Sequence, residues 1–168
     1  TKVEDGMLRP ERNNYLAAVV TTEDRLGLAF ADITTGEFAG ASFAGNDGLL
    51  RLRRELARLN AAEVLVPDAL LGELSGGGAH VSPADDWTPV DGAATVILDR
   101  TIGTDGGPAG LDAAATSAAA TLVAYVKANQ SQALHVLTAI HAHPVGEFME
   151  IDDFTWRNVE KQRNMKFK

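Results

Sequence analysis

Cysteine is missing from the sequence, and basic residues and long apolar runs are scarce. The absence of cysteine excludes disulfides, thiolate catalysis and metal sites with cysteine ligands. Aromatic residues make up only 6% of the chain, yet 45% of all residues are hydrophobic, and this share is sufficient to fill the core of a globular domain. For a chain of 168 residues we expect one domain of ordinary size and room for part of a second.

No stretch of the sequence predicts a membrane-spanning helix. The most apolar window, residues 118–130, is interrupted by Lys127 and Asn129 and is shorter than the roughly 20 residues that a span needs. Residue 1 is Thr, and no basic leader precedes an apolar stretch, so nothing indicates secretion. We therefore expect a cytoplasmic protein that does not enter membranes.

Acidic residues outnumber basic ones, and the net charge is -8. Because proteins hold phosphate backbones mainly through Lys and Arg, we do not expect this chain to bind DNA by itself. One basic cluster, Arg51, Arg53, Arg54 and Arg58, lies among leucines at helical spacing, and we interpret it as the solvated face of a helix. The C-terminal stretch, residues 156–168, is also basic, and both a tail and a contact surface for a partner are open interpretations.

Three apolar segments follow one another early in the chain, at residues 15–22, 26–33 and 37–44. Their composition suits a half-buried pleated surface, and the short polar gaps between them favour tight connections. We predict a three-stranded antiparallel meander, whose side chains alternate between two faces. In the first strand, the expected faces are Leu16, Ala18 and Val20 on one side and Ala17 and Val19 on the other.

Asp32 stands where the second predicted strand ends, shortly before Gly36. A lone carboxylate at a strand end can serve in catalysis or in a turn. The short Asp side chain accepts backbone N–H bonds in turns, and glycine supplies a positive φ where the turn requires it. We interpret Asp32 as a turn residue.

The apolar residues change to a helical period after the meander. Residues 47–59 predict a helix with Asn46 or Asp47 as its N-cap. The side chains expected to be buried against the sheet are Leu49, Leu52, Leu56 and Leu59.

The next segments alternate between strand and helix signals. Residues 62–67 predict a buried strand closed by Pro67, residues 68–74 a short helix, and residues 76–83 a loop that can include an edge strand. The resulting order β-β-β-α-β-α-β predicts a mixed sheet with helices packed against it.

The last part of the chain contains two helix signals separated by breaks. A Gly-rich break at 104–112 precedes an Ala-rich helix at 113–130, and a second break at 141–148 precedes a helix at 151–163 opened by Asp152 or Asp153. The many alanines of this helix allow close packing, and the residues that can form one of its faces are Leu111, Ala115, Ala118, Leu122, Tyr125 and Val126. Because the later helix lacks visible core partners, we expect the chain to stop inside a second domain and residues 152–168 to be more mobile than residues 10–130.

Several stretches, taken in their order and separations, resemble the connector region of bacterial MutS-type DNA mismatch repair proteins, running into the start of their core or lever domain. The stretches are RNNYLAAVV (12–20), GLAFADITTGEF (27–38), ELARLNAAEVLVP (55–67), LVAYVKANQ (122–130) and FMEIDDFTWRNVE (148–160). The most specific positions are residues 13–18 and 32–38 and, near the end, Asp152, Thr155, Arg157, Asn158 and Glu160. The resemblance covers nearly all of residues 8–160.

The resemblance implies an α/β fold similar to RNase H: a mixed sheet of three antiparallel strands followed by β-α-β units, with flanking helices and additional C-terminal helices. Residues 8–140 would form the connector-like domain, and residues 141–168 the truncated start of the core or lever domain. The chain departs from the family pattern at 91–110, which is short and Gly-rich, at 153–156, and at 161–168.

The resemblance also implies a function. The chain would be a non-catalytic connector that links the mismatch-binding and clamp/ATPase parts of one protein and offers a docking surface to a MutL-type partner. The intact protein would bind mismatched DNA and hydrolyse ATP with magnesium, whereas this segment would hold no cofactor and meet DNA only through the parent protein.

A different class of function is a stand-alone RNase H-like enzyme or a ligand-binding domain. Nucleases of that shape gather carboxylates on the first strand, the first helix and the end of the fourth strand to hold divalent metals. Here the first strand, residues 15–22, has no acid. Glu55 and Asp68 could lie near one another, but two carboxylates would hold a metal weakly, so a nuclease is not favoured.

Other chemical motifs are weak. His135, His141 and His143 could suggest zinc, but a zinc site needs convergent ligands, and we interpret the histidines as surface or capping residues. No Ser lies in a nucleophile elbow, and no Gly-rich stretch has the lysine of a phosphate-binding loop. Trp87 and Trp156 are interpreted as packing or interface residues. No catalytic, cofactor-binding or metal-binding residue is assigned.

Overall fold

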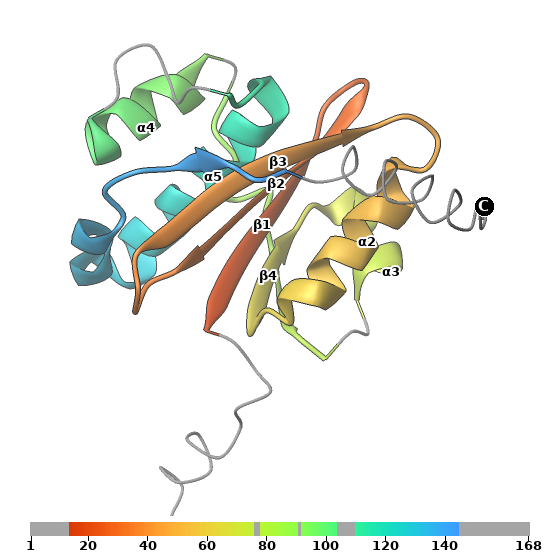
Figure 1. The fold of residues 1–168 in the computed structure, drawn as a ribbon, viewed down its shortest axis with the longest axis horizontal. Coiled ribbons are helices and arrows are strands. Elements are labelled where there is room, and N and C mark those ends of the chain that lie inside the picture. Colours follow the sequence, from red (N-terminus) through yellow and green to blue (C-terminus); the bar gives the residue numbers. More distant parts are fainter. Residues whose placement is uncertain (1–13, 76–77, 91, 104–109, 145–168) are drawn as a thin grey trace, which may run out of the picture.

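The computed structural model describes residues 14–75, 78–90, 92–103 and 110–144. They form a six-stranded sheet with the strand order β5-β4-β1-β2-β3-β6, and helices cover both of its faces (Figure 1). The predicted mixed α/β architecture is therefore confirmed. Within the described part of the chain, none of the helices combines the length and apolar character that a membrane span requires.

The three predicted N-terminal strands are present as β1 (Tyr15–Thr21), β2 (Arg25–Asp32) and β3 (Glu37–Ala44). β1 pairs with β2 and β2 with β3, both antiparallel, so the meander is confirmed. The alternation of side chains is confirmed too, because the two sets of β1 residues belong to separate core clusters on opposite faces. The sheet is consequently buried on both sides.

The remaining strands join the sheet in parallel. β4 (Glu63–Val66) pairs with β1, and β5 (His80–Pro83) pairs with β4 as the predicted edge strand. β6 (His141–Ala142) pairs with β3 at the other edge. The prediction of a break at 141–148 is thus wrong for its first two residues, because a strand of two residues is too short to show alternation in the sequence.

One face of the sheet is covered by α2 (Gly48–Leu59), the 3-10 turn η1 (Asp68–Leu70) and α3 (Leu71–Leu74), which lie together in Figure 1. The leucine spacing predicted this contact correctly. In α2, Leu52 and Leu59 are fully buried, and Leu49 and Leu56 pack against the same core cluster as partly buried residues.

The predicted N-cap of α2 is only half right. Asp47 is the residue that precedes the helix, but its side chain makes no capping hydrogen bond. Its carboxylate instead lies 3.3 Å from the Arg51 guanidinium one turn later. The ion pair occupies the side chain that a cap would use.

The other face is covered by α5 (Ala113–Asn129), α4 (Ala93–Ile102) and the 3-10 segment η2 (Ser131–Val136). The Ala-rich helix was predicted and is present, and its burial extends beyond the one face named from the sequence. Buried residues lie on nearly all sides of α5, because the helix lies between the sheet and α4 and belongs with both to one core cluster.

The helix α4 was not predicted from the sequence. It contains the consecutive β-branched residues Thr95, Val96 and Ile97, which lower helix propensity, and only Leu98 is fully buried. Glycines with positive φ stand at both of its ends. The helix predicted at 151–163, the mobility predicted for 152–168 and Trp156 lie outside the described residues, and the domain boundary after residue 140 stays a prediction.

Candidate functional site

Asp32 is a turn residue, as predicted. Its Oδ1 accepts hydrogen bonds from the backbone N–H of Thr34 at 2.9 Å and from the Thr34 hydroxyl. Its carbonyl accepts from the N–H groups of Thr35 and Gly36, and Gly36 has a φ of 88°. The carboxylate therefore closes the β2–β3 connection and is already engaged.

The two acidic residues considered for a metal site lie in different surroundings. Glu55, in α2, contacts Arg58 and His143, whereas the backbone N–H of Asp68 donates to the Asp85 carboxylate at 3.1 Å. The strand β1 contributes no acid. Within the residues that the structure describes, no group of three or more His, Asp or Glu side chains is arranged to hold a metal ion.

A polar cluster that the sequence did not predict joins the end of α2 to β6. The His143 Nε2 lies 2.8 Å from the Glu55 carboxylate and 3.0 Å from the Arg58 guanidinium, which also pairs with Glu55. The His143 ring meets the buried Phe30 edge to face, with centroids 5.0 Å apart. Phe30 in turn meets Tyr15 at 5.4 Å. We call Tyr15, Glu37, Glu55, Arg58 and His143 the Glu55–His143 cluster.

The acidity of this cluster follows from its hydrogen bonds. Burial by itself would raise the pKa of Glu55, but the hydrogen bonds from His143 and Arg58 outweigh it and lower the pKa to about 2. The Tyr15 hydroxyl donates to Glu37 at 2.6 Å, and this bond, with burial, raises the pKa of Tyr15 to about 12. Glu55 is therefore held as the charged carboxylate and Tyr15 as the neutral hydroxyl, the forms in which they make these hydrogen bonds.

The Glu55 contacts predict a specific acid sensitivity. Because the pKa of Glu55 is lowered from 4.5 to about 2 in the folded chain, its contribution is fully present above pH 4.5 and is lost as the pH falls towards 2. In the unmodified chain, we expect the loss of this contribution in acid to lower the free energy of unfolding by on the order of 1–2 kcal/mol. The Glu55→Gln variant should not show this part of the acid dependence. Urea unfolding of both proteins over this pH range measures it.

The matched control is Glu23→Gln, which changes an exposed carboxylate in the β1–β2 connection. It should leave the acid dependence as it is in the unmodified chain. Equal acid dependence in the Glu55→Gln variant and the unmodified chain would contradict the assignment.

The three histidines differ in their surroundings. His135 and His141 are exposed, which agrees with a surface role. His143 is different, since its side chain is only 21% exposed and its backbone N–H donates to Gly40 in β3 at 2.8 Å. The sequence could not reveal this role, because Glu55 and His143 are 88 positions apart.

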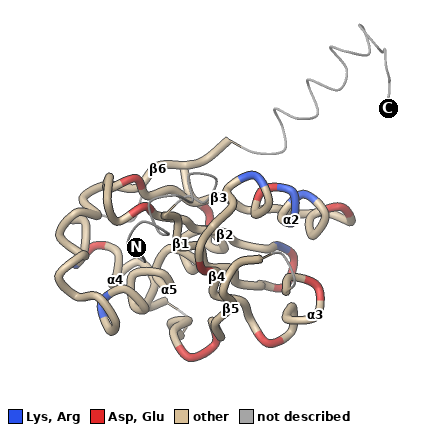
Figure 2. The backbone as a smooth tube through the Cα atoms, turned by 90° about the horizontal axis from the view of Figure 1, so that it is seen from below, with Lys and Arg blue, Asp and Glu red and all other residues tan. Residues whose placement is uncertain are grey.

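The arginines of α2 form only in part the solvated face that was predicted. Arg53 and Arg54 are exposed, and Figure 2 shows basic residues along α2 in a molecule whose other elements are rich in acids. Arg51 is different, with a side chain that is 20% exposed, lies 5.8 Å from the Phe43 ring centroid and donates to the Ala44 carbonyl at 2.7 Å. The prediction is wrong for Arg51, because its guanidinium lies over the Phe43 ring and bonds to the backbone instead of facing solvent.

Trp87 is a packing residue, as predicted. Its ring meets Tyr125 edge to face at 5.6 Å. The Tyr125 hydroxyl donates to Glu63 at 2.5 Å, and the Ser82 hydroxyl donates to the same carboxylate at 2.9 Å. The bond to Glu63, together with burial, raises the pKa of Tyr125. These contacts fasten α5 to β4 and β5.

Exposed apolar residues mark the surface of α4. Among the described residues, the large hydrophobic side chains that are exposed are Val90 (78%), Leu50 (48%) and Val96 (47%). Val90 lies just before α4 and Val96 on it. Val90, Ala94 and Thr95 also line a broad hollow between α4 and the β1–β2 connection. We call Val90, Ala94, Thr95 and Val96 the α4 surface.

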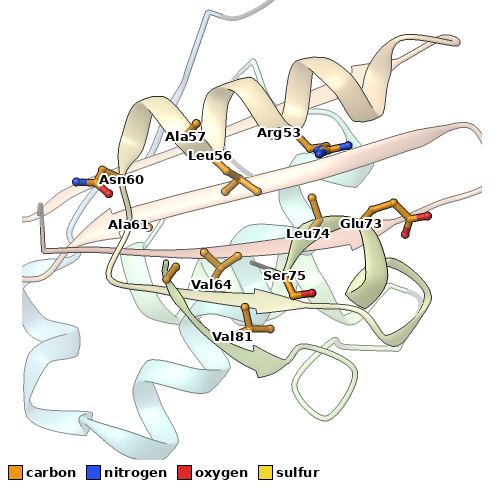
Figure 3. A pocket seen from close by; sticks show the side chains of 11 residues that line it. Arg53, Leu56, Ala57, Asn60, Ala61, Val64, Glu73, Leu74, Ser75 and Val81 are labelled. Carbon is orange, nitrogen blue, oxygen red and sulfur yellow. The ribbon is translucent and has the colours of Figure 1, made fainter. Parts of the chain in front are cut away.

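A groove lies on the opposite face of the sheet, between α2 and α3. Figure 3 shows its side chains converging from α2, β4, β5 and α3. Its volume is about 310 Å³. We call it the α2–α3 groove, and its lining residues are Arg53, Leu56, Ala57, Asn60, Ala61, Val64, Glu73, Leu74, Ser75, Ala79 and Val81.

These features favour binding over chemistry. The carboxylates of the Glu55–His143 cluster accept hydrogen bonds from neighbouring donors, and Glu55, with its pKa lowered to about 2, is a weak base. The α4 surface and the α2–α3 groove instead present apolar atoms to solvent, which is typical of contact surfaces.

Comparison with known proteins gives one consistent family. Residues 14–140 match the family model described as MutS domain II. DNA mismatch repair protein MutS of Pelotomaculum thermopropionicum is 34% identical over 97% of the chain, and that of Symbiobacterium thermophilum is 32% identical over 99%. The MutS of Roseiflexus castenholzii is 56% identical over 40% of the chain. The chain spans about a fifth of the first two relatives, 20% of each.

Proposed function

The chain belongs to the MutS domain II family, and on this premise we propose that it serves as the connector of a MutS-type DNA mismatch repair protein. It would link the mismatch-binding part of that protein to its clamp and ATPase parts. The observation that carries this proposal is the family match over residues 14–140, which includes all the strands from β1 to β5.

The connector itself is non-catalytic in this proposal. Mismatch binding and magnesium-dependent ATP hydrolysis belong to other parts of the intact protein, and the chain holds no cofactor of its own. The lack of acids on β1 and the engaged Glu55 support this view, since a two-metal nuclease needs several convergent carboxylates. The proposal includes an RNase H-like fold. It is supported by β1, which pairs antiparallel with β2 and parallel with β4.

The mechanical role follows from the way the sheet is buried. Separate apolar clusters fill the two faces, and interiors packed in this way deform little under load. A connector of this kind can hold neighbouring domains in register while it offers its outer surfaces for contact.

We place the MutL-type partner on the α4 surface. Val90 and Val96 are 78% and 47% exposed, and Val90 lines the hollow beside α4. Exposed apolar side chains next to a concave surface are typical of protein contact sites.

The test is binding of the purified chain to the MutL protein of its source organism, measured by surface plasmon resonance. Val96→Asp places a charge at an exposed apolar position of α4 and should weaken binding by about tenfold or more. The matched control, Gln132→Asp, introduces the same charge at an exposed position in η2 and should bind as the unmodified chain does. Equal binding by both variants would show that the partner does not bind at the α4 surface.

The non-catalytic role is tested on the same preparation. We expect no ATP turnover, no nuclease activity with magnesium or manganese, and no preference for mismatched over fully paired duplex at physiological salt. Metal-dependent cleavage that Glu55→Gln abolishes would instead support the alternative of an RNase H-like enzyme.

A further inference from the structure

The α2–α3 groove lies across the sheet from the α4 surface, and the two share no residue. Its floor is apolar and is formed by side chains from α2, β4, α3 and β5 and from the residues that join α2 to β4. The floor residues are Leu56, Ala61, Val64, Leu74 and Val81. A volume of about 310 Å³ suits one large apolar side chain better than an extended ligand.

The apolar surface continues from the groove along the outside of α2. Leu50, Arg53 and Ala57 are spaced by three and four residues, so they lie along one line of the helix. Leu50 is 48% exposed, and Arg53 and Ala57 line the groove. A ligand seated in the groove would therefore also reach Leu50.

The two rims of the groove carry opposite charges. Figure 3 shows Arg53 on the α2 side and Glu73 on the α3 side. Arg54 is exposed next to Arg53. Within the described residues, neither arginine forms an ion pair, whereas Arg51 and Arg58 of the same helix do. Arg53 thus presents its guanidinium group at the edge of the apolar cavity, and Arg54 presents a second one on the solvent side of α2.

We propose that the α2–α3 groove binds a short acidic segment of a partner protein, with one apolar side chain anchored in the groove. Carboxylates on the segment would pair with Arg53 and Arg54, because guanidinium groups bind carboxylates with two parallel hydrogen bonds. Glu73 repels carboxylates from the other rim and so sets the orientation of the segment.

The surroundings favour a protein segment over nucleic acid. A phosphodiester backbone has no apolar side chain that could fill the floor of the groove, whereas a protein segment can offer one. Leu50, exposed on the same line of α2, also gains contact only from an apolar partner. This surface goes beyond the connector role and does not depend on the MutL-type contact at α4.

The test is an NMR titration of the isotope-labelled chain with a short synthetic peptide in which one Leu is flanked by Glu residues. Backbone amide shifts should change in α2, α3 and β5 and not in α4. Two control peptides, one with Lys in place of Glu and one with Ala in place of Leu, should each bind at least about tenfold more weakly.

A charge exchange separates a specific contact from general attraction. In the double variant Arg53→Glu/Arg54→Glu, the acidic peptide should lose its binding and the Lys peptide should gain it. The matched control, Arg100→Glu/Lys127→Glu, makes the same change of net charge at exposed positions on α4 and α5 and should keep the preference for the acidic peptide.

Three results would overturn the proposal. They are the absence of shifts with the acidic peptide, equal shifts with the acidic and Lys peptides, and shifts of the groove amides by duplex DNA when the acidic peptide causes none. The last would identify α2 as a nucleic-acid surface. None of these results bears on MutL binding by the Val96→Asp variant, so this proposal and the connector proposal fail separately.

Discussion

Replacing Phe30 with alanine is expected to lower the free energy of unfolding by about 3–5 kcal/mol. Phe30 is fully buried in the middle of β2 and contacts the rings of Tyr15 and His143. The substitution leaves a cavity under α2 and removes the ring on which His143 rests. Since a domain has roughly 5–15 kcal/mol of stability in total, urea unfolding should show a large shift of the midpoint.

Two further variants test the reason for this effect. Phe30→Leu keeps most of the apolar volume and should cost clearly less than Phe30→Ala. Leu50→Ala removes a large side chain that is 48% exposed and should change the stability by only about 0.5 kcal/mol. A Phe30→Ala loss no larger than that of Leu50→Ala would show that Phe30 does not hold the α2 layer to the sheet.

Gly27→Ala is expected to be at least as disruptive, although it adds only a methyl group. A Cβ at Gly27 would lie 2.1 Å from the Ala114 carbonyl oxygen and 2.6 Å from the carbonyl carbon. These atoms belong to the first turn of α5, which is packed between the sheet and α4 and cannot move aside cheaply. We expect a loss of about 3 kcal/mol or more in unfolding free energy, measured by thermal and urea unfolding.

The control for this prediction is Gly72→Ala in α3. A Cβ at Gly72 meets no atom within 4 Å, and alanine is favoured over glycine in helices by about 1 kcal/mol. This variant should be neutral or slightly more stable than the unmodified chain. If Gly27→Ala unfolds like Gly72→Ala, the close contact between β2 and α5 is not a feature of the folded protein.

Local patterns determined most of the elements on their own. Apolar runs of strand-forming residues separated by short polar gaps in 15–44 predicted the meander, and leucine spacing in 47–59 predicted α2 and its buried side. Asp32 could be assigned to the turn for a similar reason, since its partners Thr34, Thr35 and Gly36 are close neighbours in the chain.

Only the tertiary structure decided the features that join distant parts of the chain. β6 is a strand because β3 offers it an unpaired edge, and α4 forms although its β-branched residues disfavour a helix, because Leu98 packs on α5. The Glu55–His143 contact spans 88 positions, and the α2–α3 groove combines residues from four elements.

The physical reason for this division is the range of the interactions. The sequence by itself determined the periodic elements, the acidic charge, the absence of cysteine chemistry and the family resemblance, since each is read from neighbouring residues or from their order. The burial of α5 on nearly all sides, the pairing of Glu55 with His143 and the two contact surfaces arise only when separate elements pack together. Those long-range contacts, and not any local motif, decide which groups are engaged in the fold and which remain free to bind a partner.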